Sequence, residues 1–155
     1  MGIVERKHMP FKYKTELSTA VKPCPAIAAS ELKTPLTAYR LVSQLTCTDA
    51  DFVPPGIMNR GANRGRPAPC DSYALSFFES KNQAAAFYCK LKAQLEKQKK
   101  TIRLGPYVAE CVIDIADGLC MPTRQSDGHF DLHEFKSAAI EQASTTIGKV
   151  NCGQS

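Results

Sequence analysis

The stretch SYALSFFESKNQAAAFYCKLKAQL, residues 72–95, joins a short apolar segment to an amphipathic one and decides the fold class. Residues 72–78 are rich in strand-forming side chains,. Ser80 and Gln83 then form a capping-box pattern, which satisfies the first free amides of a helix,. Beyond the cap, apolar side chains recur on one helical stripe, and lysines occupy the other face,. This stripe consists of Ala84, Phe87, Tyr88, Leu91 and Leu95. The stretch therefore predicts a strand that leads directly into a helix.

Further elements are predicted on both sides of this stretch. Residues 36–42 have the composition of a first core strand, and residues 107–115 alternate so that one face is apolar,. Residues 116–130 are predicted to be a loop. Residues 131–143 begin with a second capping-box-like pattern and predict another helix,. Interleaved elements of this kind predict an α+β fold, a single domain of small mixed or split antiparallel sheets with two main helices.

Length and composition bound the domain organisation. A chain of 155 residues with 43% hydrophobic and 23% charged side chains predicts one folded domain and excludes a wholly disordered chain,. Residues 1–35 are poorly patterned and contain four prolines, so they are interpreted as an N-terminal arm before an α+β domain at 36–150,. No apolar run approaches the ~20 residues of a membrane helix, so no membrane partner is expected. The oligomeric state is not indicated.

Cysteine, histidine and glycine patterns argue against several kinds of site. Seven cysteines occur without a Cys-x-x-Cys pair or an apolar N-terminal leader, which predicts reduced, mostly buried thiols in the cytoplasm,. His129 and His133 are four residues apart, but the helix start predicted at Asp131 separates them, so no metal is expected,. The sequence also lacks the motifs Gly-x-Ser-x-Gly, Gly-x-Gly-x-x-Gly and the P-loop, which weakens the conventional hydrolase, dehydrogenase and kinase interpretations,.

Positive charge is concentrated in the first two-thirds of the chain. Residues 1–103 carry 17 basic and 8 acidic side chains. Three arginines, Arg60, Arg64 and Arg66, lie in a glycine-rich loop and are candidate ligands for phosphate, for a nucleotide or for another anion,. A second basic run consists of Lys90, Lys92, Lys97, Lys99, Lys100 and Arg103. Together they indicate a noncatalytic module that binds nucleic acid or an acidic protein partner, although a solvated loop and a solvated helix face explain the same charges.

Four short segments, taken in order, resemble a known pattern. They are YRLV at 39–42, SFFES at 76–80, LGPYVAE at 104–110, and Gly128-His129 followed by Leu132. This order resembles a group of small, largely uncharacterised bacterial proteins whose pattern is similar to a reduced ADP-ribosyltransferase-like domain. The resemblance spans residues 38–135. It implies two small sheets around a cleft that binds a nicotinamide dinucleotide (NAD) as cofactor, in a cytoplasmic toxin or effector.

The resemblance also implies roles for individual residues. Arg40 would contact a phosphate or ribose of the cofactor, and Ser76 would support the cleft. A late acidic residue, Glu110 or Glu134, would polarise the ribose hydroxyl and favour an oxocarbenium-like transition state, with His129 as a replacement hydrogen-bonding group. Neither glutamate lies in the family's Glu-x-Glu or Gln-x-Glu motif.

Roles without any catalytic function fit the same residues. Arg40 is equally suited to an exposed strand edge or to pairing with Asp49 or Asp51, Ser76 to a small strand position, and Glu110 to the solvent face. The arginines of the glycine-rich loop, at positions 60, 64 and 66, would close on the cofactor phosphates if the resemblance holds.

Overall fold

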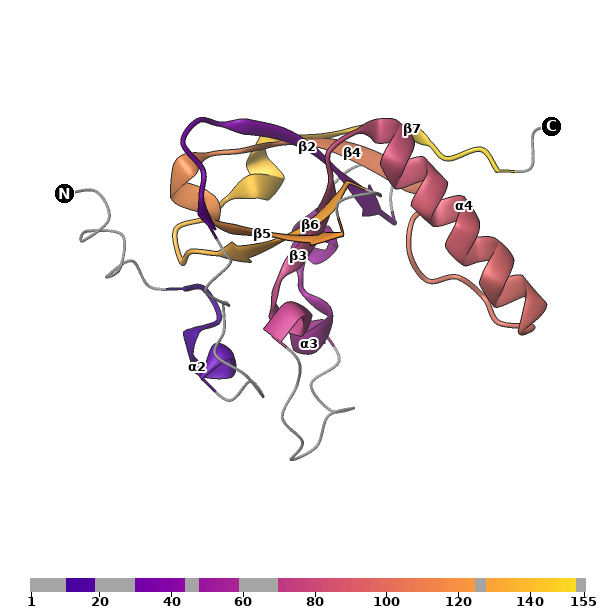
Figure 1. The fold of residues 1–155 in the computed structure, drawn as a ribbon, viewed down its shortest axis with the longest axis horizontal. Helices are drawn as coiled ribbons and strands as arrows, with labels where there is room; N and C mark the ends of the chain where they lie inside the picture. Colours follow the sequence, from indigo (N-terminus) through magenta and orange to yellow (C-terminus); the bar gives the residue numbers. More distant parts are fainter. Residues whose placement is uncertain (1–10, 19–29, 44–47, 59–69, 125–127, 153–155) are drawn as a thin grey trace.

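The computed structural model describes residues 11–18, 30–43, 48–58, 70–124 and 128–152 (Figure 1). It confirms the predicted α+β fold, with one seven-stranded sheet and one long helix, α4 (Lys81–Lys97), among the described residues. The strands are β1 (Ser30–Glu31), β2 (Leu36–Val42), β3 (Leu75–Phe78), β4 (Tyr107–Ile113), β5 (Gly118–Arg124), β6 (His129–Glu134) and β7 (Ser144–Lys149). The short helices are α2 (Lys14–Leu17) and α3 (Pro55–Met58), with single turns at η1 (Asp49–Phe52), η3 (Cys70–Tyr73), η4 (Ile115–Asp117) and η5 (Ile140–Ala143). No helix in these ranges combines the length and apolarity needed to cross a membrane.

The sheet is nearly divided into two halves. Its strand order is β1-β5-β6-β3-β2-β4-β7, and every pairing between these strands is antiparallel. β2 pairs with β4 along its whole length, but it meets β3 at a single residue pair, Tyr39 opposite Phe78. In Figure 1, β2 and β4 therefore run above β5 and β6 instead of continuing one flat surface.

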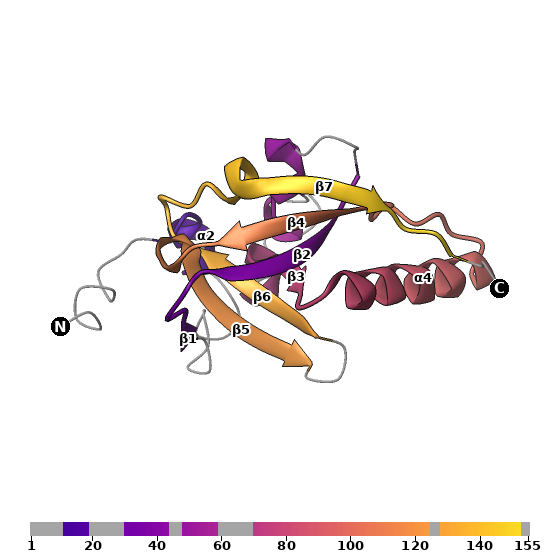
Figure 2. The same cartoon turned by 90° about the horizontal axis from the view of Figure 1, so that it is seen from above.

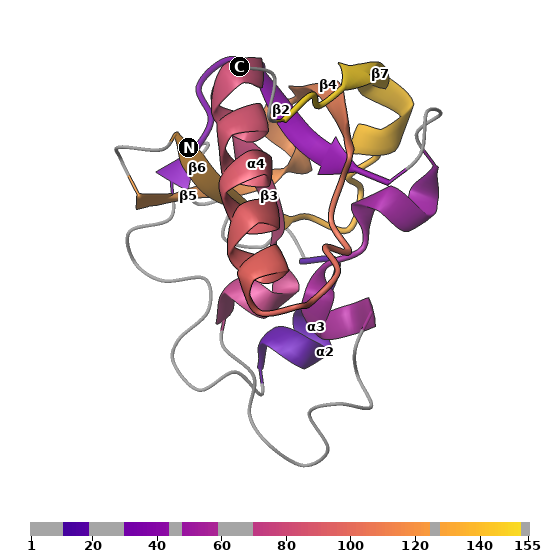
Figure 3. The same cartoon turned by 90° about the vertical axis from the view of Figure 1, so that its right-hand side faces the viewer.

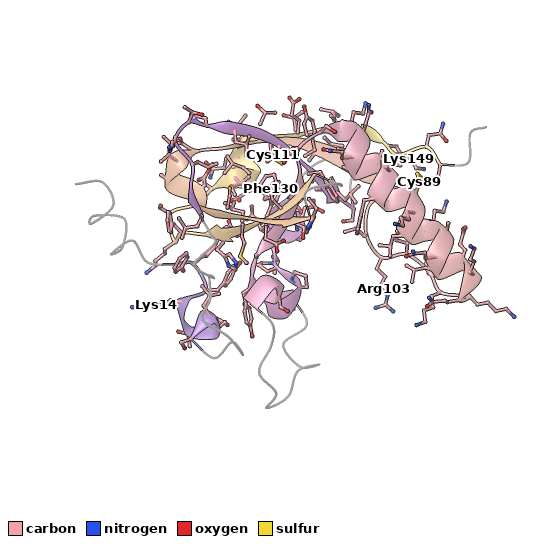
Figure 4. All side chains as sticks on the ribbon, viewed as in Figure 1. Lys14, Cys89, Arg103, Cys111, Phe130 and Lys149 are labelled. Carbon is pink, nitrogen blue, oxygen red and sulfur yellow. A yellow bond between two sulfur atoms is a disulfide. The ribbon has the colours of Figure 1, made fainter. Side chains whose placement is uncertain are left out.

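The main core fills the space between these two halves. Phe77 of β3 and Phe130 of β6 stack with ring centroids 5.8 Å apart, and they pack with Cys111 and Ile113 of β4 in the same buried cluster. Figure 4 shows Cys111 and Phe130 between the upper and lower strands. Burying a side chain of this size contributes roughly 1.5–3 kcal/mol, so this cluster holds the halves together where backbone pairing does not.

The helix α4 follows β3 as the sequence predicted. Ser80 caps the helix, and its Oγ accepts a hydrogen bond from the Gln83 backbone N–H at 3.2 Å. Ala84 and Tyr88 are buried in a second cluster together with Leu41, Phe78 and Val108. The rest of α4 extends beyond the end of the sheet, as Figure 2 shows.

The predictions for residues 116–143 were wrong. The predicted loop contains β5 and the start of β6, and the predicted second helix is replaced by the rest of β6 and the turn η5. Because β6 lies between β5 and β3 and is covered on both faces, Phe130 and Leu132 on one face and Asp131 and His133 on the other are all buried. The polar and apolar side chains of β6 do alternate, as in a strand, but the prediction followed the capping-box-like spacing at its start,. The spacing of Asp131 and Glu134 therefore resembled a helix cap only by chance.

The prediction of reduced cysteines was wrong for one pair. Cys89 of α4 and Cys152 form a disulfide across 63 residues of sequence, which joins the C-terminal segment to the helix. Cys111 and Cys120 are buried free thiols, as predicted. The three remaining cysteines, at positions 24, 47 and 70, lie outside the described side chains.

Part of the predicted N-terminal arm packs against the sheet. Phe11 bridges to Phe135, with ring centroids 5.5 Å apart, and the Lys12 backbone N–H donates to the Glu134 carbonyl at 2.9 Å. Leu17 packs with Tyr73 in a small buried cluster. Residues 11–18 therefore cover the end of the domain opposite the free end of α4 (Figure 1).

Candidate functional site

A pocket of about 300 Å³ opens where β2 and β3 diverge. Residues 40–43 of β2 and its exit form the floor, and residues from the segment 50–55 form one wall. The opposite wall comes from α4 and from the connection that returns from it to β4, which Figure 3 shows in front of the sheet. The lining includes three residues that the resemblance singled out, Arg40, Ser76 and His129.

Arg40 is held by backbone carbonyls on two neighbouring elements. Its Nε donates to the Asp51 carbonyl at 2.9 Å, and its Nη1 donates to the Ser76 carbonyl at 2.8 Å. The guanidinium also lies over the rings of Phe52 and Phe77, 5.6 and 5.8 Å from their centroids. Burial lowers the pKa of Arg40 from its ordinary value. Arg40 therefore joins β2, β3 and η1, and its bond to Asp51 goes to the carbonyl instead of the carboxylate.

Ser76 and His129 reach the pocket through the β3–β6 register. Ser76 pairs with Asp131, and Phe78 pairs with His129, so these side chains lie on the face opposite Phe77,. The His129 ring lies 5.2 Å from that of Phe78 and 6.4 Å from that of Phe87, nearly parallel to the latter. We call Phe78, Phe87 and His129 the aromatic cluster. Such a cluster can stack against a planar ring in the pocket.

Glu110 is not brought to this pocket. It is exposed on β4, and its Oε2 accepts a hydrogen bond from the Tyr39 hydroxyl at 3.1 Å. Tyr39 is also its partner in the β2–β4 register. This position agrees with a solvent-facing strand residue, and neither Glu110 nor Tyr39 belongs to the pocket lining.

Glu134 is buried at the end of β6 and does not line the pocket either. Its Oε2 lies 3.3 Å from the Lys12 ammonium, and its Oε1 has no hydrogen-bond partner among the described residues. Burial raises the pKa of Glu134 from 4.5 to about 7, although the charge of Lys12 lowers it in part. Glu134 thus connects the N-terminal segment to the sheet.

Among the described residues that line the pocket, the carboxylate side chain is that of Asp51. Its Oδ1 accepts from the Ser43 backbone N–H at 3.1 Å and from the Ser43 hydroxyl at 3.0 Å. Its Oδ2 accepts from the Thr48 backbone N–H at 3.0 Å and from the Thr48 hydroxyl at 3.4 Å. Because both oxygens bond the protein, this carboxylate organises the pocket wall and is poorly available to a ligand.

Two lining residues were assigned to other roles by the sequence. Phe87 was placed on the apolar stripe of α4, and it is 36% exposed and lines the pocket. Arg103 was grouped with the lysines of the helix, yet it lies on the returning connection (Figure 4), where it is exposed and belongs to the pocket lining. The helical spacing of Phe87 and the charge of Arg103 did not indicate that either residue lines a pocket. The predicted basic loop, with Arg60, Arg64 and Arg66, lies outside the described residues.

The pocket thus combines an aromatic cluster, an exposed guanidinium and a carboxylate already bonded by the protein. Within the part of the chain that the structure describes, no three His, Cys, Asp or Glu side chains gather as a metal site. Comparison of the chain with protein-family models, curated proteins and solved structures found no match. The chemistry of these residues is therefore the basis for a functional proposal.

The contacts of Arg40 predict a structural role. Arg40→Met should lower the free energy of unfolding by about 3 kcal/mol, because it leaves two carbonyls without their charged donor. Urea unfolding followed by circular dichroism measures this change. The matched control is Arg103→Met, which removes an exposed guanidinium and should change stability by less than about 0.5 kcal/mol. Equal stability of the two variants would contradict the structural role of Arg40.

The raised pKa of Glu134 predicts a pH-dependent stability. Because the folded-state pKa of about 7 lies above the ordinary 4.5, the stabilisation is complete below pH 4.5 and is lost as the pH rises through 7,. The wild type should therefore lose stability relative to Glu134→Gln between pH 5 and pH 8. Urea unfolding at intervals across this range tests the difference, with Glu110→Gln as the control for loss of an exposed carboxylate. Parallel curves for the wild type and Glu134→Gln would refute the prediction.

Proposed function

We propose that this protein binds a nicotinamide dinucleotide in the pocket between β2, β3 and the α4–β4 connection, as an ADP-ribosyltransferase-like toxin or effector. One observation carries the proposal. Arg40, Ser76 and His129 are far apart in the sequence but line one pocket. They are the residues that the resemblance associates with the cleft, and the weak β2–β3 pairing is consistent with the split sheets that the resemblance implies.

The chemistry of the pocket supports a ligand with a planar ring and phosphate groups. Phe87, which is 36% exposed, and the half-buried His129 offer ring surface for stacking, and Arg103 offers a guanidinium for phosphate oxygens,. A volume of about 300 Å³ lies at the lower limit for small-molecule sites,. The pocket therefore suits one nucleotide half of the dinucleotide, with the other half outside it.

The same residues support binding more directly than group transfer. ADP-ribosyl transfer breaks the bond between nicotinamide and ribose, and an acidic group stabilises the positive charge that develops on the ribose. Asp51 is engaged by Ser43 and Thr48, while Glu110 lies outside the pocket. His129 is the remaining candidate for a hydrogen bond to a ribose hydroxyl, and its Nε2 lies 3.8 Å from the Asp131 carboxylate, so we expect any transfer to be slow.

The disulfide bears on where this function takes place. Disulfides persist mainly in oxidising compartments. The bond between Cys89 and Cys152 therefore favours an oxidising compartment over the cytoplasm that the sequence predicted. Such a location suits an exported toxin or effector.

Isothermal titration calorimetry with the dinucleotide tests the proposal. The wild type should bind, and His129→Ala should weaken binding about tenfold, since it removes one ring of the aromatic cluster. Glu110→Gln changes a polar residue outside the pocket and should leave the affinity within twofold. Absence of binding by the folded wild type at millimolar dinucleotide would rule the proposal out.

A second candidate function is nucleic-acid binding by the basic surface of α4. Its supporting observation is that Lys90, Lys97, Lys99 and Lys100 are all exposed on or just after the projecting part of the helix (Figure 2). An acidic protein partner would suit the same charges.

Fluorescence anisotropy with a labelled duplex tests this candidate. Affinity should fall steeply with salt, and the triple variant Lys97→Gln, Lys99→Gln, Lys100→Gln should reduce the slope of log K against log salt by roughly 2–3. Lys14→Gln, on α2 at the other end of the molecule (Figure 4), is the matched control. No detectable binding at low salt would eliminate this function.

A further inference from the structure

We infer that Arg103, and not Arg40, is the residue that binds the phosphate groups of the pocket's ligand. The inference rests on the proposed function and deepens it, because it assigns the anion-binding role to the rim that the α4–β4 connection forms. The two arginines are the cationic side chains of the described lining, and their surroundings differ sharply.

The surroundings of Arg40 leave little of its guanidinium for a ligand. Two of its nitrogen atoms already donate to the Asp51 and Ser76 carbonyls. The rings of Phe52 and Phe77 lie against the same group. A phosphate that took over these donors would leave two carbonyls unpaired, at a cost of about 1–3 kcal/mol each.

The surroundings of Arg103 leave its guanidinium accessible. The residue is exposed, and within the described parts of the chain no acceptor or acidic group is recorded against it. Figure 4 shows its side chain directed away from α4. An arginine fork presents several donors in one plane and binds two phosphate oxygens at once. Arg103 can therefore engage an anion without breaking an existing bond.

The backbone on both sides of Arg103 is fixed by packing. Ile102 is half-buried against the cluster of Leu41, Tyr88 and Val108. Gly105 is buried at φ +74°, and a Cβ at this position would collide with the Tyr88 ring. Because the chain is anchored on both sides, little backbone freedom is lost when a ligand binds Arg103.

The neighbours of Arg103 in the pocket wall indicate what else the ligand carries. Leu104 and Phe87 are exposed large apolar side chains, at 37% and 36%, and both line the pocket. Exposed apolar surface beside a guanidinium fits a ligand in which a planar or apolar ring adjoins a phosphate. The ligand class is thus a nucleotide whose phosphates lie at the rim and whose ring enters the pocket.

Calorimetry with two ligands that carry phosphate groups and one that carries none tests the inference. The probes are the nicotinamide dinucleotide, ADP and nicotinamide riboside, which carries no phosphate. Arg103→Gln should weaken dinucleotide and ADP binding roughly 10–100-fold, the loss expected for hydrogen bonds to a charged group, and leave riboside binding within twofold. Arg103→Lys should be intermediate, and Lys100→Gln is the control for a nearby exposed cation.

Each outcome separates this inference from the proposed function. If the wild type binds the dinucleotide and Arg103→Gln binds it equally well, the inference fails and the proposed function stands. If the wild type binds ADP through Arg103 but not the dinucleotide, the inference stands and the proposed function fails. If neither phosphate ligand binds the wild type, both fail. A variant of the basic loop, with Arg60, Arg64 and Arg66 changed to Gln, gives one further comparison. If this variant binds the phosphate ligands more weakly and Arg103→Gln does not, the inference is overturned.

Discussion

The half-buried guanidinium of Arg40 compensates for the missing hydrogen bonds between the two halves of the sheet. β2 and β3 pair at only one position, so the Ser76 carbonyl lies beyond the point where the ladder ends. A buried carbonyl without a donor is costly. Arg40 donates to that carbonyl and to the carbonyl of Asp51. The strands can therefore diverge, and the space that results is the pocket.

The walls of the pocket depend on this arrangement in different ways. The wall at η1 is attached to β2 by the Arg40 bond to Asp51, and the Asp51 carboxylate in turn bonds Ser43 and Thr48. The opposite wall is attached by apolar packing, since Tyr88 and Ile102 belong to the cluster beneath α4. One wall is thus fixed by polar bonds and the other by burial, and only the second carries the exposed ring and guanidinium that suit a ligand.

The sequence predicted the elements whose patterns are local. β2, predicted as the first core strand, has its predicted bounds, and the Ser80 cap of α4 was confirmed, because both depend on neighbouring residues. β6 was mistaken for a helix because Asp131 and Glu134 have the spacing of a capping box, and Cys89 gave no sign of a partner 63 residues away. Arg103 was missed because its position depends on how the chain returns from α4.

Binding the dinucleotide and transferring its ADP-ribose group place opposite demands on the charges of the pocket. A carboxylate free to stabilise a cationic ribose would also repel the phosphates of a dinucleotide at short range. Here the Asp51 carboxylate is enclosed by four donors, which spread its negative charge over the wall. Arg103, in contrast, faces solvent. The balance favours anions at the rim, while the acidic group nearest His129, the Asp131 carboxylate with its Oδ1 3.8 Å from Nε2, is buried and lies outside the pocket lining.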